Sequence, residues 1–223
     1  MKIRLGVISE EHNINILQEV IEKYNDYEIT AFIDPDGTHT LNIIDNHQQE
    51  FDSWLVFDQI NYLHIKNWGK AQKPVYYIPY RGASFYKTLC TAIYQGFKID
   101  ELSIDTIPYY DITRALDDMQ INYNVINHLS DEHGALSLNG YAAFHRELFK
   151  KGITKAAVTK SCYVKSLLES EGIPTFCIMP VRVTVRNILN VILTQFRIKK
   201  LREGQIAVQV FSFNLLGDKD NFW

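Results

Sequence analysis

The sequence predicts an α/β protein built of two Rossmann-like lobes, each with a parallel sheet. Short β-prone runs alternate with amphipathic helical stretches nearly from end to end, which is typical of βαβ units. The order of elements in the first half recurs in the second half. With 223 residues, of which 46 % are hydrophobic and 13 % aromatic, the chain can bury a sizeable core. This composition excludes disordered, collagen-like and coiled-coil classes.

The first half predicts four strands and three helices as lobe 1, which we place at residues 1–83. In chain order they are strand Lys2–Ile8, helix Glu11–Tyr24, strand Glu28–Ile33, helix Thr40–Gln49, strand Ser53–Phe57, helix Ile60–Trp68 and strand Val75–Ile78. A turn rich in Pro, Gly and Ser follows at residues 79–84. It leads into a crossover helix at about Phe85–Gly96, within residues 84–98, and Ser84 is its expected N-cap.

The second half predicts lobe 2 at residues 99–180, again with four strands and three helices. They are strand Leu102–Pro108, helix Ile112–Gln120, strand Asn124–Asn127, helix Asn139–Lys150, strand Ala156–Thr159, helix Cys162–Glu171 and strand Thr175–Met179. Gly152 and Gly172 stand where helix C-terminal glycines are expected.

Two further segments complete the predicted organisation. Residues 181–204 form a long returning helix, because apolar residues recur there at nearly helical spacing. Residues 205–223 begin with an alternating, β-prone run that has no partner strand after it. That strand either joins a sheet of the two lobes or begins a further domain, and we favour the second interpretation.

Charge and hydropathy narrow the function classes. The formal net charge of −3 gives the whole chain no basic excess for a dedicated nucleic-acid binder. The basic end of the long helix could serve as an arm toward a partner or toward DNA, although a cationic last turn is common in helices. No apolar run is long enough to span a bilayer, and no secretory leader is visible, so we expect a cytoplasmic protein.

Candidate ligand residues follow from the rule that open α/β sheets bind ligands beyond the carboxyl ends of their strands. Two facing lobes turn those ends into a cleft. The candidates are Ser9, Asp58, Gln59, Arg81, Gly82, Ala83, Ser84, Tyr109, Thr159, Lys160, Ser161, Arg182 and Thr184.

Two helix starts among these candidates suit an anion. In the turn from Arg81 to Ser84, Gly82 allows close backbone approach, the helix start offers N–H donors and the guanidinium adds a bidentate clamp. The run 159–161 opens the second-lobe helix in the same way. An ordinary capped turn is the alternative interpretation of each.

The remaining candidates have plainer alternatives. Tyr109 and its neighbour Tyr110 could form an aromatic wall, although a chain with 13 tyrosines contains such pairs by chance. Arg182 and Thr184 could report ligand binding to the long helix, or simply cap it.

Histidine and cysteine spacing predicts neither a metal site nor a cofactor site. The seven histidines form no HExxH motif, and Cys90, Cys162 and Cys177 show no CxxC spacing. We expect the three cysteines to be small buried residues. The standard nucleophile and nucleotide motifs GxSxG, GxGxxG and GxxxxGK[ST] are also missing from the sequence.

Short patterns give the chain a resemblance to a known family. They are Ile3–Ser9 as a first strand, Lys155–Thr159 with its Ala–Val pair, Glu171–Thr175 with a Gly–Ile step, and Pro180–Arg186 as a polar turn into a helix. In these and in layout, about residues 2 to 200 resemble two-lobed sensor domains of periplasmic-binding-protein type. The sequence is most similar to the N-terminal sensor domain of propionate-catabolism activators, which are cytosolic transcription regulators. The resemblance implies a small-molecule sensor leading into an output domain outside this chain.

The sequence is compatible with three functions. The favoured one is the sensor domain of a cytoplasmic, homodimeric transcription regulator. It would bind a small anionic metabolite without catalysis and reach DNA only through an attached domain. The second is a racemase- or decarboxylase-like enzyme with thiols at strand ends, for which only Cys162 is well placed because Cys177 lies inside a strand. The third is a dimerisation scaffold with a vestigial cleft.

Overall fold

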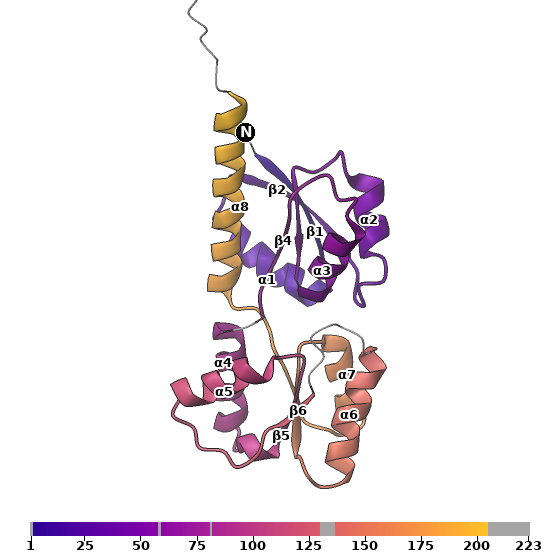
Figure 1. Cartoon of the computed structure of the whole chain (residues 1–223), viewed down its shortest axis with the longest axis vertical. Coiled ribbons are helices and arrows are strands. Elements are labelled where there is room, and N and C mark those ends of the chain that lie inside the picture. Colours follow the sequence, from indigo (N-terminus) through magenta and orange to yellow (C-terminus); the bar gives the residue numbers. More distant parts are fainter. Residues whose placement is uncertain (1, 58, 81, 130–136, 205–223) are drawn as a thin grey trace, which may run out of the picture.

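Two parallel four-stranded sheets organise the computed structural model, which describes residues 2–57, 59–80, 82–129 and 137–204 (Figure 1). The strand orders are β2-β1-β3-β4 and β6-β5-β7-β8, so the two sheets have the same topology. The strands are β1 (Ile3–Ser9), β2 (Tyr27–Ile33), β3 (Ser53–Val56), β4 (Val75–Tyr77), β5 (Leu102–Asp105), β6 (Asn127–Leu129), β7 (Ala156–Thr159) and β8 (Thr175–Cys177). The predicted two-lobed α/β fold is confirmed.

Helices cover both faces of each sheet, because the central strands β1, β3, β5 and β7 are buried almost throughout. Lobe 1 carries α1 (Glu11–Ile21), α2 (Thr40–His47), α3 (Gln59–Trp68) and the last helix, α8 (Arg182–Glu203). Lobe 2 carries α4 (Ala83–Tyr94), a 3-10 turn (Ile99–Glu101), α5 (Tyr109–Asp118), α6 (Leu138–Lys150) and α7 (Cys162–Ser170).

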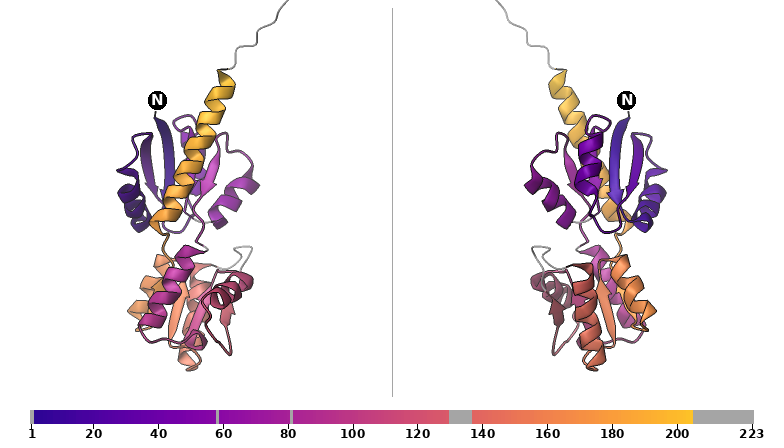
Figure 2. Two further views of the ribbon diagram at one scale, coloured as in Figure 1. Left: turned by 90° about the vertical axis from the view of Figure 1, so that its left-hand side faces the viewer. Right: turned by 90° about the vertical axis from the view of Figure 1, so that its right-hand side faces the viewer.

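The chain passes between the lobes twice, after β4 and after β8, and α8 then returns along lobe 1 (Figures 1 and 2). The Tyr27 hydroxyl donates to the carbonyl of Leu189, and Arg197 pairs with Asp26 at 3.1 Å. One continuous apolar cluster joins α8 to both sheets and to α4. The predicted returning helix therefore packs as part of lobe 1. The expected strand at 205–223 lies outside the described residues.

Three predicted boundaries are wrong for local reasons. The strand expected at 102–108 ends at Asp105, because Thr106 adopts a φ of +56° and turns the chain out of the sheet. The strand expected at 124–127 occupies 127–129 instead. The Asp100 carboxylate accepts the backbone N–H groups of Asn124 and Val125, at 2.8 and 3.2 Å, and holds them in a loop.

The third wrong boundary concerns the start of α4. Gly82, with a φ of +61°, is the N-cap, and Ser84 lies one residue inside the helix. A positive φ at this position favours glycine. The helix therefore begins directly after Gly82, two residues before the start that a Ser84 cap predicts.

A fully buried polar triad anchors α6 on β5. His145 shares one hydrogen bond with the Ser103 hydroxyl, at 2.7 Å from Nδ1, and a second with the Asp105 carboxylate, at 3.1 Å from Nε2. All three side chains are buried, and their hydrogen bonds replace those that water would otherwise make. The arrangement holds lobe 2 together rather than offering a reactive serine.

We predict that His145→Ala lowers the free energy of unfolding by about 2–4 kcal/mol, because it removes the imidazole partner of a buried carboxylate and a buried hydroxyl and leaves a cavity. Urea denaturation followed by circular dichroism measures the change. His64→Ala, an exposed position on α3, is the matched control. Equal stability of the two variants would contradict the anchoring role.

Candidate functional site

The carboxyl ends of β1 and β7 meet where the lobes contact each other. The residues directly after β1 open α1, and those directly after β7 open α7. His12 of α1 lies 3.2 Å from Cys162 of α7, measured from Nε2 to Sγ, across 150 residues of sequence. The central strands of both sheets therefore point toward the same place, as parallel α/β topology favours for ligand sites.

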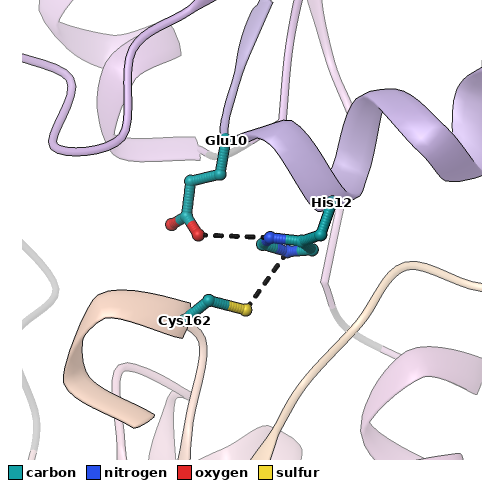
Figure 3. A group of neighbouring side chains, drawn as sticks. All are labelled: Glu10, His12 and Cys162. Atoms are coloured by element: carbon teal, nitrogen blue, oxygen red, sulfur yellow. Dashed lines mark hydrogen bonds and ion pairs between the residues drawn. The ribbon is translucent and has the colours of Figure 1, made fainter. Parts of the chain in front are cut away.

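Glu10, His12 and Cys162 form a cluster at this contact (Figure 3). The imidazole stands between the other two side chains, with Nδ1 lying 3.4 Å from the Glu10 carboxylate and Nε2 facing the sulfur. One ligand-type atom from each residue lies within 4.8 Å of the others. A carboxylate, an imidazole and a thiol thus converge from both lobes.

Two more sulfur atoms surround Cys162. Cys177, the last residue of β8, lies 3.1 Å from it, and Met179 lies 3.9 Å from it. The Cys177 thiol also lies 3.7 Å from the carbonyl of Lys160, as a donor. Cys162 and Cys177 are half-buried and Cys90 is exposed, so the expectation of three buried cysteines is wrong.

Cys162 is placed to be a thiolate. Its pKa falls to about 5, first because Cys177 donates to the sulfur, and then because His12 supplies a hydrogen bond and positive charge that outweigh burial. Its position as the first residue of α7 adds the favourable field of a helix N-terminus. Burial lowers the pKa of His12, but its contact with Cys162 and the nearby Glu10 carboxylate outweigh this effect and raise the pKa overall. The same hydrogen bond and burial raise the pKa of Cys177.

Ser9, a predicted ligand residue, is engaged within lobe 1. Its buried hydroxyl accepts from the Asn13 amide at 3.0 Å, and the same amide donates to the Tyr80 hydroxyl at 2.9 Å. This network ties the end of β1 to the segment that leaves lobe 1. The Asn13 side-chain oxygen is buried and has no hydrogen-bond partner among the described residues.

The predicted helix starts differ in how they are capped. At α7, the Ser161 hydroxyl accepts from the backbone N–H of Val164 at 3.3 Å, and the buried Thr159 hydroxyl accepts from the Ser161 N–H at 3.2 Å. At α4, Gly82 and Ala83 are exposed and no side chain caps the helix. The Ser84 hydroxyl is buried without a partner among the described residues. The start of α4 therefore retains more donor capacity than that of α7.

The other predicted residues take varied positions. Tyr109 begins α5 rather than following a strand, is half exposed, and lies beside His128 with the two rings tilted and their centroids 5.8 Å apart. Arg182 pairs with Glu19 of α1 at 2.5 Å, and Thr184 lies in the first turn of α8. Lys160, directly after β7, is half-buried.

Gln59 is the first residue of α3. Asp58 and Arg81 lie outside the described residues. Ser9, Lys160 and Ser161 lie next to Glu10 or Cys162 in the sequence, and the structure adds His12, Cys177 and Met179 as residues that contact Cys162. Their positions at or just beyond strand ends could have signalled them, because the strand-end rule applies to them as well.

A pocket of about 430 Å³ opens beside the sulfur atoms, between α4, α7 and the edge strand β8. Two lysines and a glutamate give it charged walls. Its lining residues are Lys87, Thr88, Thr91, Gln95, Lys165, Glu169, Pro174, Thr175, Phe176, Cys177 and Met179. Because Cys177 and Met179 line the pocket and also contact Cys162, the pocket adjoins the cluster.

The fold of this chain is similar to those of several solved structures. An NtrC family transcriptional regulator from Clostridium acetobutylicum matches over 89 % of this chain and 99 % of its own, at 13 % identity and a TM-score of 0.64. The two chains share one fold. The predicted resemblance to two-lobed sensor domains is thereby confirmed for the fold.

Two weaker likenesses accompany it. A LacI family transcription regulator from Clostridium acetobutylicum matches at 14 % identity and a TM-score of 0.44, over 89 % of this chain and 94 % of its own. A periplasmic solute-binding protein of an ABC transporter from Actinobacillus succinogenes, with bound D-allose, matches at 12 % identity and 0.46, over 92 % and 94 %. No family model and no curated protein matches the sequence. No helix within the described ranges has both the length and the hydrophobicity to cross a membrane.

We predict that Cys162 is alkylated by iodoacetamide at nearly its maximal rate already at about pH 6, because the thiolate is the reactive form and its pKa is about 5. His12→Ala removes the hydrogen bond and positive charge, raises the thiol pKa and slows the reaction at that pH about tenfold. Peptide mapping by mass spectrometry in a Cys90→Ser background measures the rates. Identical pH profiles with and without His12 would contradict the pairing.

Proposed function

We propose that this chain is the ligand-sensing domain of a cytoplasmic transcriptional regulator, and that a small anionic metabolite binds between its two lobes. The observation that carries the proposal is the meeting of both sheets' carboxyl ends at one contact between the lobes, marked by His12 and Cys162. A ligand bound at the contact between the lobes changes the free energy of lobe closure. A ligand that touches both lobes stabilises the closed arrangement.

An anionic ligand is supported by the helix starts around this contact. The α4 start offers backbone N–H groups at Gly82 and Ala83 with no capping side chain. The sequence places Arg81 beside them, and Lys160 adds a cation at the end of β7. Carboxylates and phosphates are the ligand classes that such donors bind.

Signal transfer in this proposal runs through α8. The helix begins at the second passage between the lobes, where Arg182 binds Glu19, and packs on lobe 1 through Val185, Leu189 and Ile192. A change in lobe closure therefore moves the start of α8 relative to lobe 2. We assign no DNA contact to this chain. In this proposal an attached DNA-binding domain responds to the movement of α8.

We further propose that α8 mediates homodimerisation. Val191, Thr194, Ile198 and Leu201 are exposed and are spaced by three, four and three residues, which is the seam pattern of paired helices. A second copy of this chain would bury the stripe by matching it with itself across a two-fold axis.

A thermal-shift screen against carboxylate and phosphate metabolites tests ligand binding. We expect one compound class to raise the melting temperature saturably, since a ligand at 100 times its dissociation constant adds about 2.7 kcal/mol of stability. Arg81→Ala should abolish the shift, whereas Lys150→Ala, an exposed cation on α6, should leave it intact. No shift with any compound, or equal shifts in both variants, would contradict the proposed anion site.

Sedimentation equilibrium tests the dimer. Wild-type protein should sediment as a dimer, and Ile198→Glu with Leu201→Glu should convert it to a monomer by placing two carboxylates in the apolar seam. Gln195→Glu, exposed on α8 outside the stripe, is the control that should remain dimeric. A dimer that survives the double substitution would show that α8 does not form the interface.

A thiol enzyme is the second candidate, favoured by the Cys162 and His12 pair, which resembles an activated nucleophile and its base. The two-thiol racemase arrangement fits less well, because the Cys162 and Cys177 sulfur atoms lie 3.1 Å apart and leave no room for a substrate carbon between them. We propose binding without turnover. Product analysis of the compounds that shift the melting temperature distinguishes the two: conversion abolished by Cys162→Ser would favour the enzyme.

A further inference from the structure

We propose that His12, Cys162 and Cys177 form a zinc site that bridges the two lobes. His12 comes from α1 of lobe 1, whereas Cys162 and Cys177 come from α7 and β8 of lobe 2. Nothing in the sequence spacing places them together. This proposal concerns the same contact between the lobes but does not depend on a metabolite binding there.

The separations of the ligand atoms suit a shared ion. The Cys162 sulfur lies 3.2 Å from the His12 Nε2 atom and 3.1 Å from the Cys177 sulfur. Bonds of about 2.0–2.3 Å around tetrahedral zinc put neighbouring ligand atoms about 3.3–3.8 Å apart. Opening the Cys162–His12 contact by a few tenths of an ångström and the sulfur–sulfur contact by about 0.6 Å brings both to the spacing of a metal site. The Cys177 sulfur lies outside the group of ligand atoms that are within 4.8 Å of one another, so it must also move toward His12 to complete the site.

Glu10 supplies the outer support that histidine ligands usually have. Its carboxylate lies 3.4 Å from Nδ1, the imidazole nitrogen that does not face Cys162. The carboxylate and the sulfur contact opposite nitrogens of the ring (Figure 3). A carboxylate on Nδ1 favours the tautomer in which Nε2 carries the lone pair, and it would orient the ring toward a metal at Nε2.

The ligand types select among metals. Thiolates disfavour Mg²⁺ and Ca²⁺, which take oxygen ligands. Two cysteines, an imidazole and an adjacent carboxylate form the mixed sulfur, nitrogen and oxygen set that Zn²⁺ accepts. Cu(I) prefers sulfur and gains nothing from the carboxylate, although the Met179 thioether lies 3.9 Å from Cys162. We therefore assign zinc.

A bound ion would couple the lobes directly. It would tie the start of α1 to the start of α7 and to the end of β8, where otherwise only non-covalent contacts join those elements across the lobes. Three protein ligands leave a fourth coordination position, as in zinc sites that accept an exogenous ligand. Zinc would thus hold the lobes in the closed arrangement.

Competition against a chromophoric zinc chelator, using the whole 223-residue chain under reducing conditions, tests the site. Wild-type protein should bind one equivalent, and Cys162→Ser or His12→Ala should weaken binding on the order of a hundredfold, with about tenfold for Glu10→Gln. Cys90→Ser, an exposed cysteine on α4, is the control that should bind as wild type. His12→Cys should retain binding, because a thiolate replaces the imidazole as a ligand.

Cobalt substitution gives an independent readout. Co²⁺ in the wild-type protein should show thiolate charge-transfer and tetrahedral d–d absorption, which Cys162→Ser loses while its far-ultraviolet circular dichroism stays unchanged. Binding of less than one equivalent, wild-type affinity in Cys162→Ser, or binding of Cu(I) alone would overturn the assignment. No metabolite is present in these measurements, so their failure would leave the sensor proposal intact.

Discussion

The double passage of the chain between its lobes is the constraint on which the rest of the structure depends. Each sheet has the order 2-1-3-4 within its lobe, and because its strands are parallel their carboxyl ends all lie at the same end of the sheet. The chain leaves lobe 1 after β4 and returns after β8, and this holds the carboxyl ends of the two sheets facing each other. The side chains that follow β1 and β7 consequently meet although 150 residues separate them.

Hydrophobic burial and a few polar anchors keep this arrangement in register. One apolar cluster runs from lobe 1 through α4 into lobe 2, so the two lobes share a hydrophobic core. Polar contacts then fix individual elements: Tyr27 on α8, and His145 on β5. Since buried polar groups are costly when unpaired, these contacts specify where each helix sits more sharply than apolar packing does.

The contact between the lobes combines features that favour a regulatory role. A thiol with a lowered pKa, an imidazole with a raised pKa and a carboxylate lie together at half-buried positions, where electrostatic interactions are only partly screened by water. Any ion or small molecule that engages groups from both lobes changes the balance between closed and open arrangements. The helix α8 begins at the second passage and so lies where such a change would be transmitted.

The sequence by itself determined the kinds and order of the elements, since hydrophobic periodicity and turn residues are local signals. Strand β7 was predicted with its observed bounds, and most helices within a few residues. The residues at strand ends were also identifiable, because topology places ligands there. Ser9 directly precedes Glu10, and Lys160 and Ser161 directly precede Cys162.

Tertiary structure alone decided how those residues pair. Cys177 was judged unable to join Cys162 because it lies in a strand, yet its position as the last residue of β8 brings the two sulfur atoms to 3.1 Å. The start of α4 and the end of β5 depended on left-handed backbone at Gly82 and Thr106, which the sequence does not specify uniquely. Contacts between distant residues arise from packing of whole elements, and no local pattern encodes them.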